Sequence, residues 1–358
     1  MKDDFSKKQQ FFTRKLLEWH EKFNTRAMPW KYEKDPYKIW ISEIILQQTR
    51  VEQGLEYYNR FIKRFPNVMK LAAANEEDVF KLWEGLGYYS RCRNLIATAQ
   101  FIAIERKGIF PDTHEDILTL KGIGPYTAAA IASFAFQLPF AVVDGNVMRV
   151  LARFFAIDTP IDSAAGKKIF NELAQSLLKK ENPGIYNQAI MDLGATVCKP
   201  RSPLCNQCLL SAQCAAFNSN TMEDFPIKEK KLKIKERWFN YLIAEMNDKF
   251  YTRPRTKKDI WQQLQEFILI ETESQVSDKQ LFKSSAFKEI INDNFQHISS
   301  SISIMQKLTH QHIHGTFIHI KLEKPILDQS YSLKSKAGLK KLAFPKLIAA
   351  HISEKKLF

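Results

Sequence analysis

The chain has 358 residues, of which 53 are Lys or Arg and 39 are Asp or Glu, and its formal net charge is +14. A hydrophobic content of 45% excludes a wholly disordered chain, and the length suffices for two domains with separate cores. The positive charge favours a polyanionic partner such as DNA, because cations placed on phosphates release condensed counterions, although a protein that is merely basic has the same composition.

Membrane and secretion signals are not expected from this sequence. No apolar stretch is long enough to span a bilayer, and "MKDDFSKKQQ" lacks the apolar core of a signal peptide. We therefore expect an intracellular, reducing location. Disulfides are not expected there, so the grouping of four of the five cysteines calls for another explanation.

The first part of the chain, residues 1–216, carries the apolar spacing of helices. This spacing occurs in "FFTRKLLEWHEKF", "PYKIWISEIILQQTRVEQGLEYYNRFIKRF" and "NEEDVFKLWEGL", with prolines between the segments. Asn75, Asp112 and Asp116 are candidate helix caps. The pattern predicts an all-α domain.

A different pattern follows a charged segment, residues 217–233, that has no helical face and is predicted to be a linker. Residues 234–358 are predicted to form a separate α+β domain. "WFNYLIAEMNDKFYTRPR" predicts two strands around an Asn-Asp turn, and "HGTFIHIKLE" alternates like a strand. "KAGLKKLAFPKLIAAHI" predicts a short helix near the end of the sequence.

The stretch "LKGIGPYTAAAI" predicts a tight turn followed by a helix rich in small residues. Gly122 and Gly124 permit close backbone approach, and the unpaired N–H groups and dipole of the helix form an anion site. A plain turn between helices is the alternative. Because the helical "HEDILTL" precedes it, the pair predicts a helix–hairpin–helix that binds a DNA phosphate without reading sequence, with Lys121 adding charge.

Four cysteines in "CKPRSPLCNQCLLSAQC", residues 198–214, follow the spacing C-x6-C-x2-C-x5-C. Zinc sites built from four cysteines usually pair two C-x2-C knuckles, and here there is one. A cuboidal iron–sulfur cluster accepts irregular spacing, because each thiolate only has to reach one corner. The sequence thus favours an iron–sulfur cluster over zinc, with Cys198, Cys205, Cys208 and Cys214 as ligands, and it predicts that Cys92 is a packing residue.

Two carboxylates stand in contexts that separate their chemistry. Glu43 is the only charged residue in the apolar "WISEIILQQT"; burial would raise its pKa and suit a general acid, unless the helix turns it to solvent. Asp144 precedes "NVMRVLARFF" as a candidate helix cap, where the dipole and amides would hold it ionised. One protonated and one ionised carboxyl form the pair that cleaves glycosidic bonds.

Together these motifs resemble the adenine DNA glycosylases of the MutY type, helix–hairpin–helix enzymes with a [4Fe-4S] cluster. The resemblance covers most of residues 26–214, through "MPW", "DPYKIWISEIILQQT", "LWEGLGYYSRCRNL", "LKGIGPYTAAAI", "VDGNVMRVLAR", "YNQAIMDLGATVC" and the cysteine loop. It implies a monofunctional glycosylase of base excision repair. Such an enzyme hydrolyses the N-glycosidic bond of adenine mispaired with 8-oxoguanine or guanine and leaves an abasic site.

The resemblance also implies catalytic roles. Glu43 would protonate the flipped adenine at N7, Asp144 would stabilise the sugar cation, covalently or by charge, and Asn146 would orient the attacking or leaving group. Flipping is needed because the glycosidic bond is unreachable inside the stack. Relatives that also cut the strand carry a lysine where Tyr126 stands, and a phenol cannot form their Schiff base.

Other matching positions concern the bases themselves. Trp30, Leu46 and Gln188 match the adenine pocket, while Gln48 and Tyr88 match residues that wedge into the duplex. Without the resemblance, ordinary helix packing would explain each of these five residues.

The C-terminal domain resembles the NUDIX-like domain that checks for 8-oxoguanine opposite adenine. The family's recognition stretch is Phe-Ser-His, and here it is matched by "LTH", in which Thr309 keeps a hydroxyl and His310 keeps the ring. No NUDIX catalytic glutamate cluster is visible, so pyrophosphatase activity is not expected. Further histidines alternate along the following strand, as on a polar strand face.

The expected protein is a monomer that acts on double-stranded DNA containing A·8-oxoguanine mispairs. It would work in a bacterial cytoplasm, associated with the nucleoid and without a membrane, with a sliding clamp as a candidate partner. Three alternatives remain at this point. They are an endonuclease III-like glycosylase/lyase on oxidised pyrimidines, an iron–sulfur protein that only binds DNA, and a zinc-stabilised DNA-binding protein.

Overall fold

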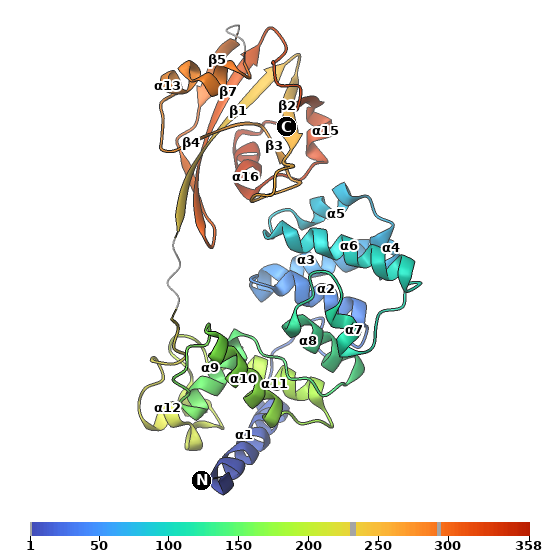
Figure 1. The fold of residues 1–358 in the computed structure, drawn as a ribbon, viewed down its shortest axis with the longest axis vertical. Coiled ribbons are helices and arrows are strands. Elements are labelled where there is room, and N and C mark those ends of the chain that lie inside the picture. The colour runs from blue at the N-terminus through green and yellow to red at the C-terminus, as the bar shows by residue number, and fades with distance from the viewer. Residues whose placement is uncertain (1, 230–233, 292–294) are drawn as a thin grey trace. The chain divides into compact units, whose positions relative to one another are not determined.

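The computed structural model describes residues 2–229, 234–291 and 295–358 (Figure 1). The chain divides into two compact units, one of residues 1–72 and 97–231, the other of residues 73–96 and 232–358. The last four residues of the predicted linker, 230–233, lie outside the described residues. Each unit has its own buried apolar core.

The first unit is helical, as predicted, since every strand of the described chain begins at Lys235 or later. Its helices are α1 (Lys2–Phe23), α2 (Pro36–Leu46), α3 (Val51–Arg64), α4 (Val68–Ala72), α7 (His114–Leu118), α8 (Pro125–Phe136), α9 (Gly145–Phe155), α10 (Ala164–Leu177), α11 (Pro183–Thr196) and α12 (Ala215–Asn218). Helix α6 (Tyr89–Glu105) begins in the second unit and continues into the first.

The core of the first unit lies between α1, α9, α10 and α11, where Phe12, Phe154 and Phe170 are fully or almost fully buried. Helices α9 and α11 approach each other closely at Gly194. A Cβ on Gly194 would lie 2.7 Å from Asn146 Cβ and 2.9 Å from the Asn146 carbonyl oxygen. Only glycine leaves room for this contact, which fixes the start of α9 against α11.

The predicted helix–hairpin–helix is formed by α7 and α8, which pack against each other. Gly122 has a φ of 80°, a conformation that favours glycine, and Gly124 is the N-cap of α8. The predicted caps are corrected in part. Asn75 caps α5 (Glu76–Trp83), but Thr113 caps α7 in place of Asp112 or Asp116, because its hydroxyl accepts the Asp116 N–H.

One predicted helical stretch is interrupted. The pattern from residue 36 to residue 65 spans two helices, because α2 ends at Leu46 and α3 begins at Val51. Gln48, in the connection, adopts a φ of 56° although it is not glycine. The break is not announced by proline or glycine in "QQTR", so the apolar spacing alone does not reveal it.

The second unit contains α5, the start of α6 and a mixed sheet of eight strands with helices packed around it. The strands are β1 (Lys235–Met246), β2 (Lys249–Pro254), β3 (Gln265–Glu266), β4 (Ile268–Thr272), β5 (Phe295–Ser300), β6 (Ile304–Lys307), β7 (Gln311–Leu322) and β8 (Ser332–Ser335). The helices that follow β4 are α13 (Asp278–Lys283), α14 (Ser285–Lys288), α15 (Lys336–Lys340) and α16 (Lys346–Lys355). The long strands β1 and β7 pair in parallel at the centre, and the other pairings are antiparallel (Figure 1).

Sequence expectations for this region are largely confirmed. β1 and β2 join through Asn247 and Asp248, both with positive φ as a tight hairpin requires. β7 contains the predicted alternating strand. The predicted C-terminal helix is instead two helices, α15 and α16, because Pro345 between them cannot donate to a continuing helix.

Hydrogen bonds explain why residues 73–96 belong to the second unit. Arg93 Nη1 donates to the Gln262 carbonyl at 2.9 Å, and Lys81 Nζ donates to the Leu342 carbonyl at 2.9 Å. The Phe344 N–H donates to Glu84 at 2.8 Å.

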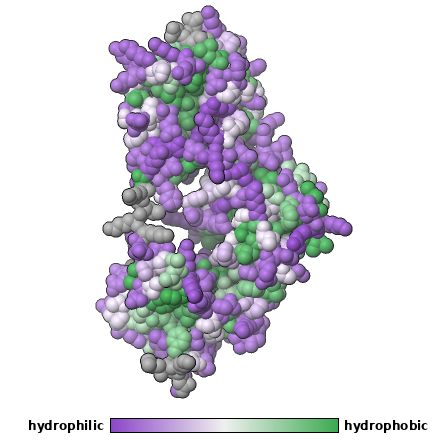
Figure 2. All heavy atoms as spheres, viewed as in Figure 1, coloured by the Kyte–Doolittle hydropathy of each residue, from purple (hydrophilic) through white to green (hydrophobic). Residues whose placement is uncertain are grey.

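The surface in view is mainly hydrophilic in both units, with smaller groups of apolar side chains (Figure 2). Among the helices of the described residues, none combines the length and apolar character that crossing a membrane demands.

The α9–α11 contact predicts the effect of Gly194→Ala. The added methyl would lie 2.7–3.1 Å from Asn146 atoms that include the backbone, so we expect a loss of about 1–3 kcal/mol in the free energy of unfolding. Gly145→Ala is the matched control, since nothing lies within 4 Å of its added Cβ. Chemical denaturation measures both variants, and equal stabilities would contradict the close contact.

Candidate active site

A cavity of about 390 Å³ opens between the helices of the first unit. Its walls come from the segment before α2, from α2 itself, and from the starts of α8, α9 and the middle of α11. Eight of the predicted site residues line it: Trp30, Glu43, Leu46, Gln48, Tyr126, Asp144, Asn146 and Gln188. Its volume is within the usual range for small-molecule and base-sized ligands.

Glu43 is carried into this cavity by α2, which begins at the Asp35 cap and Pro36 and is apolar on most of its surface. The side chain is buried, with 7% of its surface exposed. Burial raises the pKa of Glu43 to about 7; a hydrogen bond with Tyr126 opposes the shift and the nearby charge of Asp144 adds to it. The predicted burial is confirmed, and a carboxyl with this pKa can donate a proton near neutrality.

Tyr126, in the first turn of α8, lies beside Glu43 in the cavity. Burial, together with the charges of Glu43 and Asp144, raises the pKa of its phenol well above 10.0. The group is therefore a neutral hydroxyl that can donate to the Glu43 carboxyl. It supplies no amine.

Asp144 is the N-cap of α9, as predicted. Its carboxylate accepts the Val147 N–H at 2.7 Å and the Asn146 side-chain amide at 2.6 Å. These bonds lower the pKa of Asp144, but burial is the larger effect and the net direction is upward. The helix start therefore offsets the cost of burying this carboxylate without fully cancelling it, which differs from the sequence expectation.

Asn146 connects this carboxylate to a cation. Arg149 Nη2 donates to the Asn146 side-chain oxygen at 2.8 Å and to the Gly194 carbonyl at 2.8 Å. Arg149 Nε donates to the Cys198 carbonyl at 2.8 Å. Hydrogen bonds thus run from Asp144 through Asn146 and Arg149 to the first residue of the cysteine loop.

The wall that carries Trp30 has no regular secondary structure and is held by α11. Asp192 is completely buried and accepts hydrogen bonds from Arg26 at 2.8 Å and from Asn24 at 2.9 Å. Lys31 Nζ forms an ion pair with the same carboxylate at 3.3 Å. Asp192 therefore anchors the chain on both sides of Trp30.

The hairpin between α7 and α8 exposes Lys121, Gly122 and Gly124. The Thr98 hydroxyl donates to the Lys121 carbonyl at 2.8 Å and holds the turn. Because the α8 N-cap is glycine, no side chain caps the first N–H groups of the helix. This arrangement suits an anion.

The four loop cysteines line one apolar cavity with residues of α9 and α11. The loop contains two short helical turns, Cys205–Gln207 and Ser211–Gln213. Arg153, buried on α9, donates to Cys198 Sγ at 3.5 Å and to the Lys199 carbonyl at 2.7 Å. In residues 2–229, 234–291 and 295–358, no three His, Cys, Asp or Glu side chains meet as ligands of a single metal ion. Cys92 is fully buried elsewhere, as predicted.

The remaining predicted residues, Tyr88, Thr309 and His310, belong to the second unit. They line a cavity of about 520 Å³ there. Tyr88 has a φ of 48°, and its hydroxyl forms a hydrogen bond with the Thr309 hydroxyl. The structure thus groups these three residues apart from the eight in the first cavity.

Two buried charges of the site were missed in the sequence. Arg149 is 8% exposed and Asp192 is completely buried. Asp192 is the only charged residue of α11, which is the signal that singled out Glu43, and applied to "IMDLGA" it would have found Asp192. Arg149 shares α9 with a second arginine, Arg153, so a single charge in an apolar helix does not mark it.

The raised pKa of Glu43 predicts how stability depends on pH. Folded Glu43 holds its proton up to about pH 7, whereas the usual pKa of the group is 4.5. The protonated Glu43 side chain therefore adds to the free energy of unfolding. This stabilisation is complete below pH 4.5 and is lost as the pH rises through about 7, a loss of about 3 kcal/mol. Glu43→Gln should remove this loss, as measured by urea unfolding at about pH 5 and pH 8.

The exposed Glu56→Gln is the matched control and should follow the wild-type protein at both pH values. If the free energy of unfolding changes equally with pH in the wild-type and Glu43→Gln proteins, the prediction is contradicted, and water reaches the Glu43 carboxyl.

Comparisons with known proteins identify the relatives of this chain. Residues 41–178 match the HhH-GPD superfamily of base excision DNA repair proteins. The adenine DNA glycosylase of Buchnera aphidicola subsp. Acyrthosiphon pisum (strain APS) is 37% identical over 254 residues, covering 71% of this chain and 72% of the relative. The adenine DNA glycosylase of Rattus norvegicus is 43% identical over 214 residues, which cover 57% of this chain and 41% of the relative.

Solved structures share the fold of the helical part. A thermostable thymine-DNA glycosylase, 28% identical, matches with a TM-score of 0.56 over 60% of this chain and 99% of its own. An endonuclease III in a non-covalent DNA complex, 22% identical, matches with a TM-score of 0.51 over 60% of this chain and 97% of its own, which shows the fold alone. With these sequence and structural matches, the chain belongs to the adenine DNA glycosylase family, within the HhH-GPD superfamily.

Proposed function

We propose that this protein is a monofunctional adenine DNA glycosylase of base excision repair, acting on adenine mispaired with 8-oxoguanine or guanine. The observation that carries the proposal is the meeting of Glu43 and Asp144 in one cavity, one a carboxyl with a pKa of about 7 and the other a carboxylate that accepts hydrogen bonds. Two carboxyls of this kind divide the work of glycosidic bond cleavage.

In this mechanism, the adenine leaves the base stack and enters the cavity lined by Trp30, Leu46 and Gln188. Glu43 gives its proton to N7 of adenine. The C1′–N9 bond breaks and its electron pair goes to N9, so the base departs neutral. Asp144 stabilises the positive charge on the sugar, and water then bonds to C1′ and releases a proton.

Asn146 and Arg149 support this step by holding Asp144. The side-chain amide of Asn146 donates to Asp144 while its oxygen accepts from Arg149, so the amide orientation is fixed. A fixed carboxylate needs no reorganisation as charge develops on the sugar. Tyr126 supports monofunctional chemistry, since a phenol cannot form the imine that a strand-cutting lyase needs.

The second cavity supports recognition of the base opposite adenine. We assign this role to Thr309 and His310, with Tyr88 and Gln48 filling space in the duplex. Gln48 and Tyr88 are both non-glycine residues with positive φ, and strain of this kind concentrates at functional sites. From the sequence resemblance, the domain of residues 234–358 is proposed to be NUDIX-like.

Cys198, Cys205, Cys208 and Cys214 are proposed to hold a [4Fe-4S] cluster. Their four thiols share one apolar cavity, and a cuboidal cluster takes one thiolate at each corner. When bound, the cluster supplies metal–thiolate bonds that fix the loop. The neighbouring Lys199 and Arg201, together with the α7–α8 hairpin, would then press positive charge and N–H groups on the DNA phosphates.

A single-turnover assay with a duplex containing one A·8-oxoguanine pair tests the proposed activity. Wild-type protein should release adenine and give strand breaks only after alkali. Glu43→Gln should slow base loss by at least about 100-fold, because the side chain can no longer donate a proton. Glu56→Gln is the matched control and should keep the wild-type rate.

Strand breaks without alkali would contradict the role given to Tyr126 and favour a glycosylase/lyase. Base loss from neither A·8-oxoguanine nor A·G would leave DNA binding without catalysis. Activity on oxidised pyrimidines alone would favour the endonuclease III-like alternative.

The cluster has a test of its own. We expect brown purified protein with about four iron and four sulfide ions per chain, and loss of both in Cys208→Ala. Cys92→Ala should keep the iron and the sulfide, because Cys92 is a fully buried residue of the second unit and is not one of the four loop cysteines. Stoichiometric zinc without iron in the wild-type protein would contradict the assignment.

A further inference from the structure

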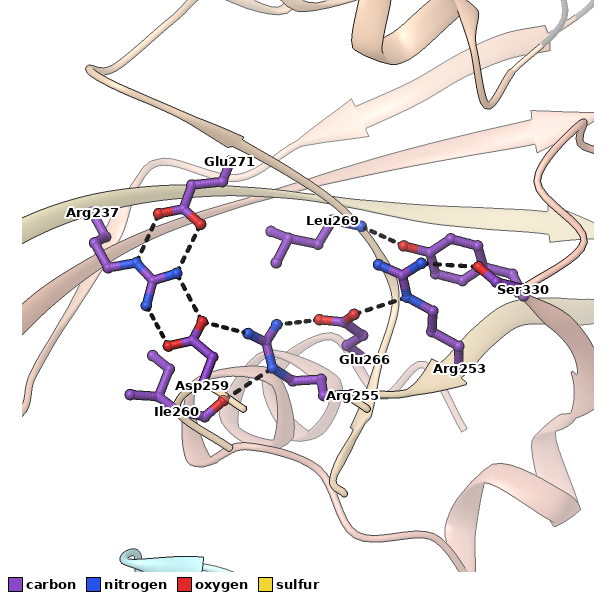
Figure 3. Close-up of polar contacts among 10 residues, drawn as sticks. Arg237, Arg253, Arg255, Asp259, Ile260, Glu266, Leu269, Glu271 and Ser330 are labelled. Atoms are coloured by element: carbon purple, nitrogen blue, oxygen red, sulfur yellow. Dashed lines mark hydrogen bonds and ion pairs between the residues drawn. The ribbon is translucent and has the colours of Figure 1, made fainter. Parts of the chain in front are cut away.

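A network of ion pairs in the second unit joins buried arginines to carboxylates, of which Asp259 and Glu271 are partly exposed (Figure 3). Arg237 of β1 is 9% exposed and uses all five of its N–H donors. It binds Glu271 through Nε and Nη2 at 2.7 and 2.8 Å, and Asp259 through Nη1 and Nη2, both at 2.9 Å. Its last donor, on Nη1, reaches the Gln311 side-chain oxygen at 3.1 Å.

Gln311 directly follows Thr309 and His310, the two residues proposed to recognise the base opposite adenine. The Leu308 N–H donates to the Gln311 carbonyl at 2.7 Å, which leaves Thr309 and His310 as the two residues of a tight hairpin loop. The Lys235 N–H donates to the His310 carbonyl at 3.0 Å. The turn is thus held by a backbone bond to β1, by the bond between the Thr309 and Tyr88 hydroxyls, and, through Gln311, by the side-chain bond from Arg237.

Asp259, the second partner of Arg237, belongs to the loop that forms another wall of the cavity of the second unit. This loop comprises residues 255–264. Its first residue, Arg255, forms ion pairs with Asp259 at 3.2 Å and with the buried Glu266. Figure 3 shows the guanidinium of Arg237 between the carboxylates of Glu271 and Asp259, with Arg255 on the far side of Asp259. Arg237 therefore joins two walls of one cavity.

We propose that Arg237 is a positioning residue for recognition of the base opposite adenine, acting through Gln311 on the Thr309–His310 turn and through Asp259 on the facing loop. The inference rests on the proposed function. An apolar side chain can replace a buried charged residue, together with its partners, with equal or better stability, so stability alone does not require a buried arginine at this position. The planar guanidinium of Arg237, with five directed hydrogen bonds, fixes the orientation of the groups that it binds. A fixed orientation of the Thr309–His310 turn is what recognition of a base requires.

The test compares single-turnover rates, below enzyme saturation, for adenine opposite 8-oxoguanine and opposite guanine. Gln311→Ala and Arg237→Lys should each lower the ratio of the two rates about tenfold, by slowing the 8-oxoguanine reaction. The double variant should lose no more than Arg237→Lys alone, because the loss of Arg237 already removes the hydrogen bond to Gln311. Arg253→Gln is the matched control, since Arg253 pairs with Glu266 and Asp328 at the other end of the network. It should lower the unfolding temperature and leave the ratio unchanged.

Equal slowing of the reactions opposite 8-oxoguanine and opposite guanine would overturn the proposal in favour of a purely structural role. Additive losses in the double variant would overturn it in favour of a direct contact between Gln311 and DNA. If Arg237→Lys fails to fold, Gln311→Ala decides alone, and an unchanged ratio in it overturns the proposal. Wild-type protein that removes adenine equally well opposite both bases overturns the recognition role of the second unit, and this inference with it. That outcome is recognised before any variant is made.

Discussion

The active site depends on how closely α9 and α11 approach each other at Gly194. The start of α9 presents Asp144 and Asn146, and their position follows from backbone contact with α11. The Gly194 carbonyl also accepts a hydrogen bond from Arg149, which continues to the Cys198 carbonyl. One small residue thus lets three parts of the first unit meet: the Asp144 carboxylate at the start of α9, helix α11 and the cysteine loop.

Burial gives the two carboxyls of the cavity their different chemistry. Glu43 sits inside an apolar helix, where its charged form loses hydration and only the Tyr126 hydroxyl compensates it. Asp144 is partly buried, yet a backbone N–H and a side-chain amide at a helix start stabilise its charged form. The cost of removing a charged carboxylate from water therefore remains largely in place for Glu43 and is partly offset for Asp144.

Much of this could be predicted from the sequence, where local rules decide the outcome. The Asp144 cap, the α7–α8 hairpin and the Asn247–Asp248 turn follow from short-range backbone preferences. The burial of Glu43 could not be derived from periodicity, since α2 is apolar on most sides and does not indicate which side faces the core.

Two further features were hidden for different reasons. The break at Gln48 carries no glycine or proline, so nothing in the local sequence announces its positive φ. The partners of Arg237 are 22, 34 and 74 residues away in the sequence. Only the folded sheet brings them together.

The anchoring of Trp30 by Asp192 has a consequence for selectivity. Helix α11 carries both Gln188, which lines the cavity, and Asp192, which holds the irregular segment around Trp30 through Arg26 and Lys31. Moving this segment away from α11 would break ion pairs to a carboxylate that is completely buried. Under the proposed function, we expect this link to limit the size of the base that can enter the cavity.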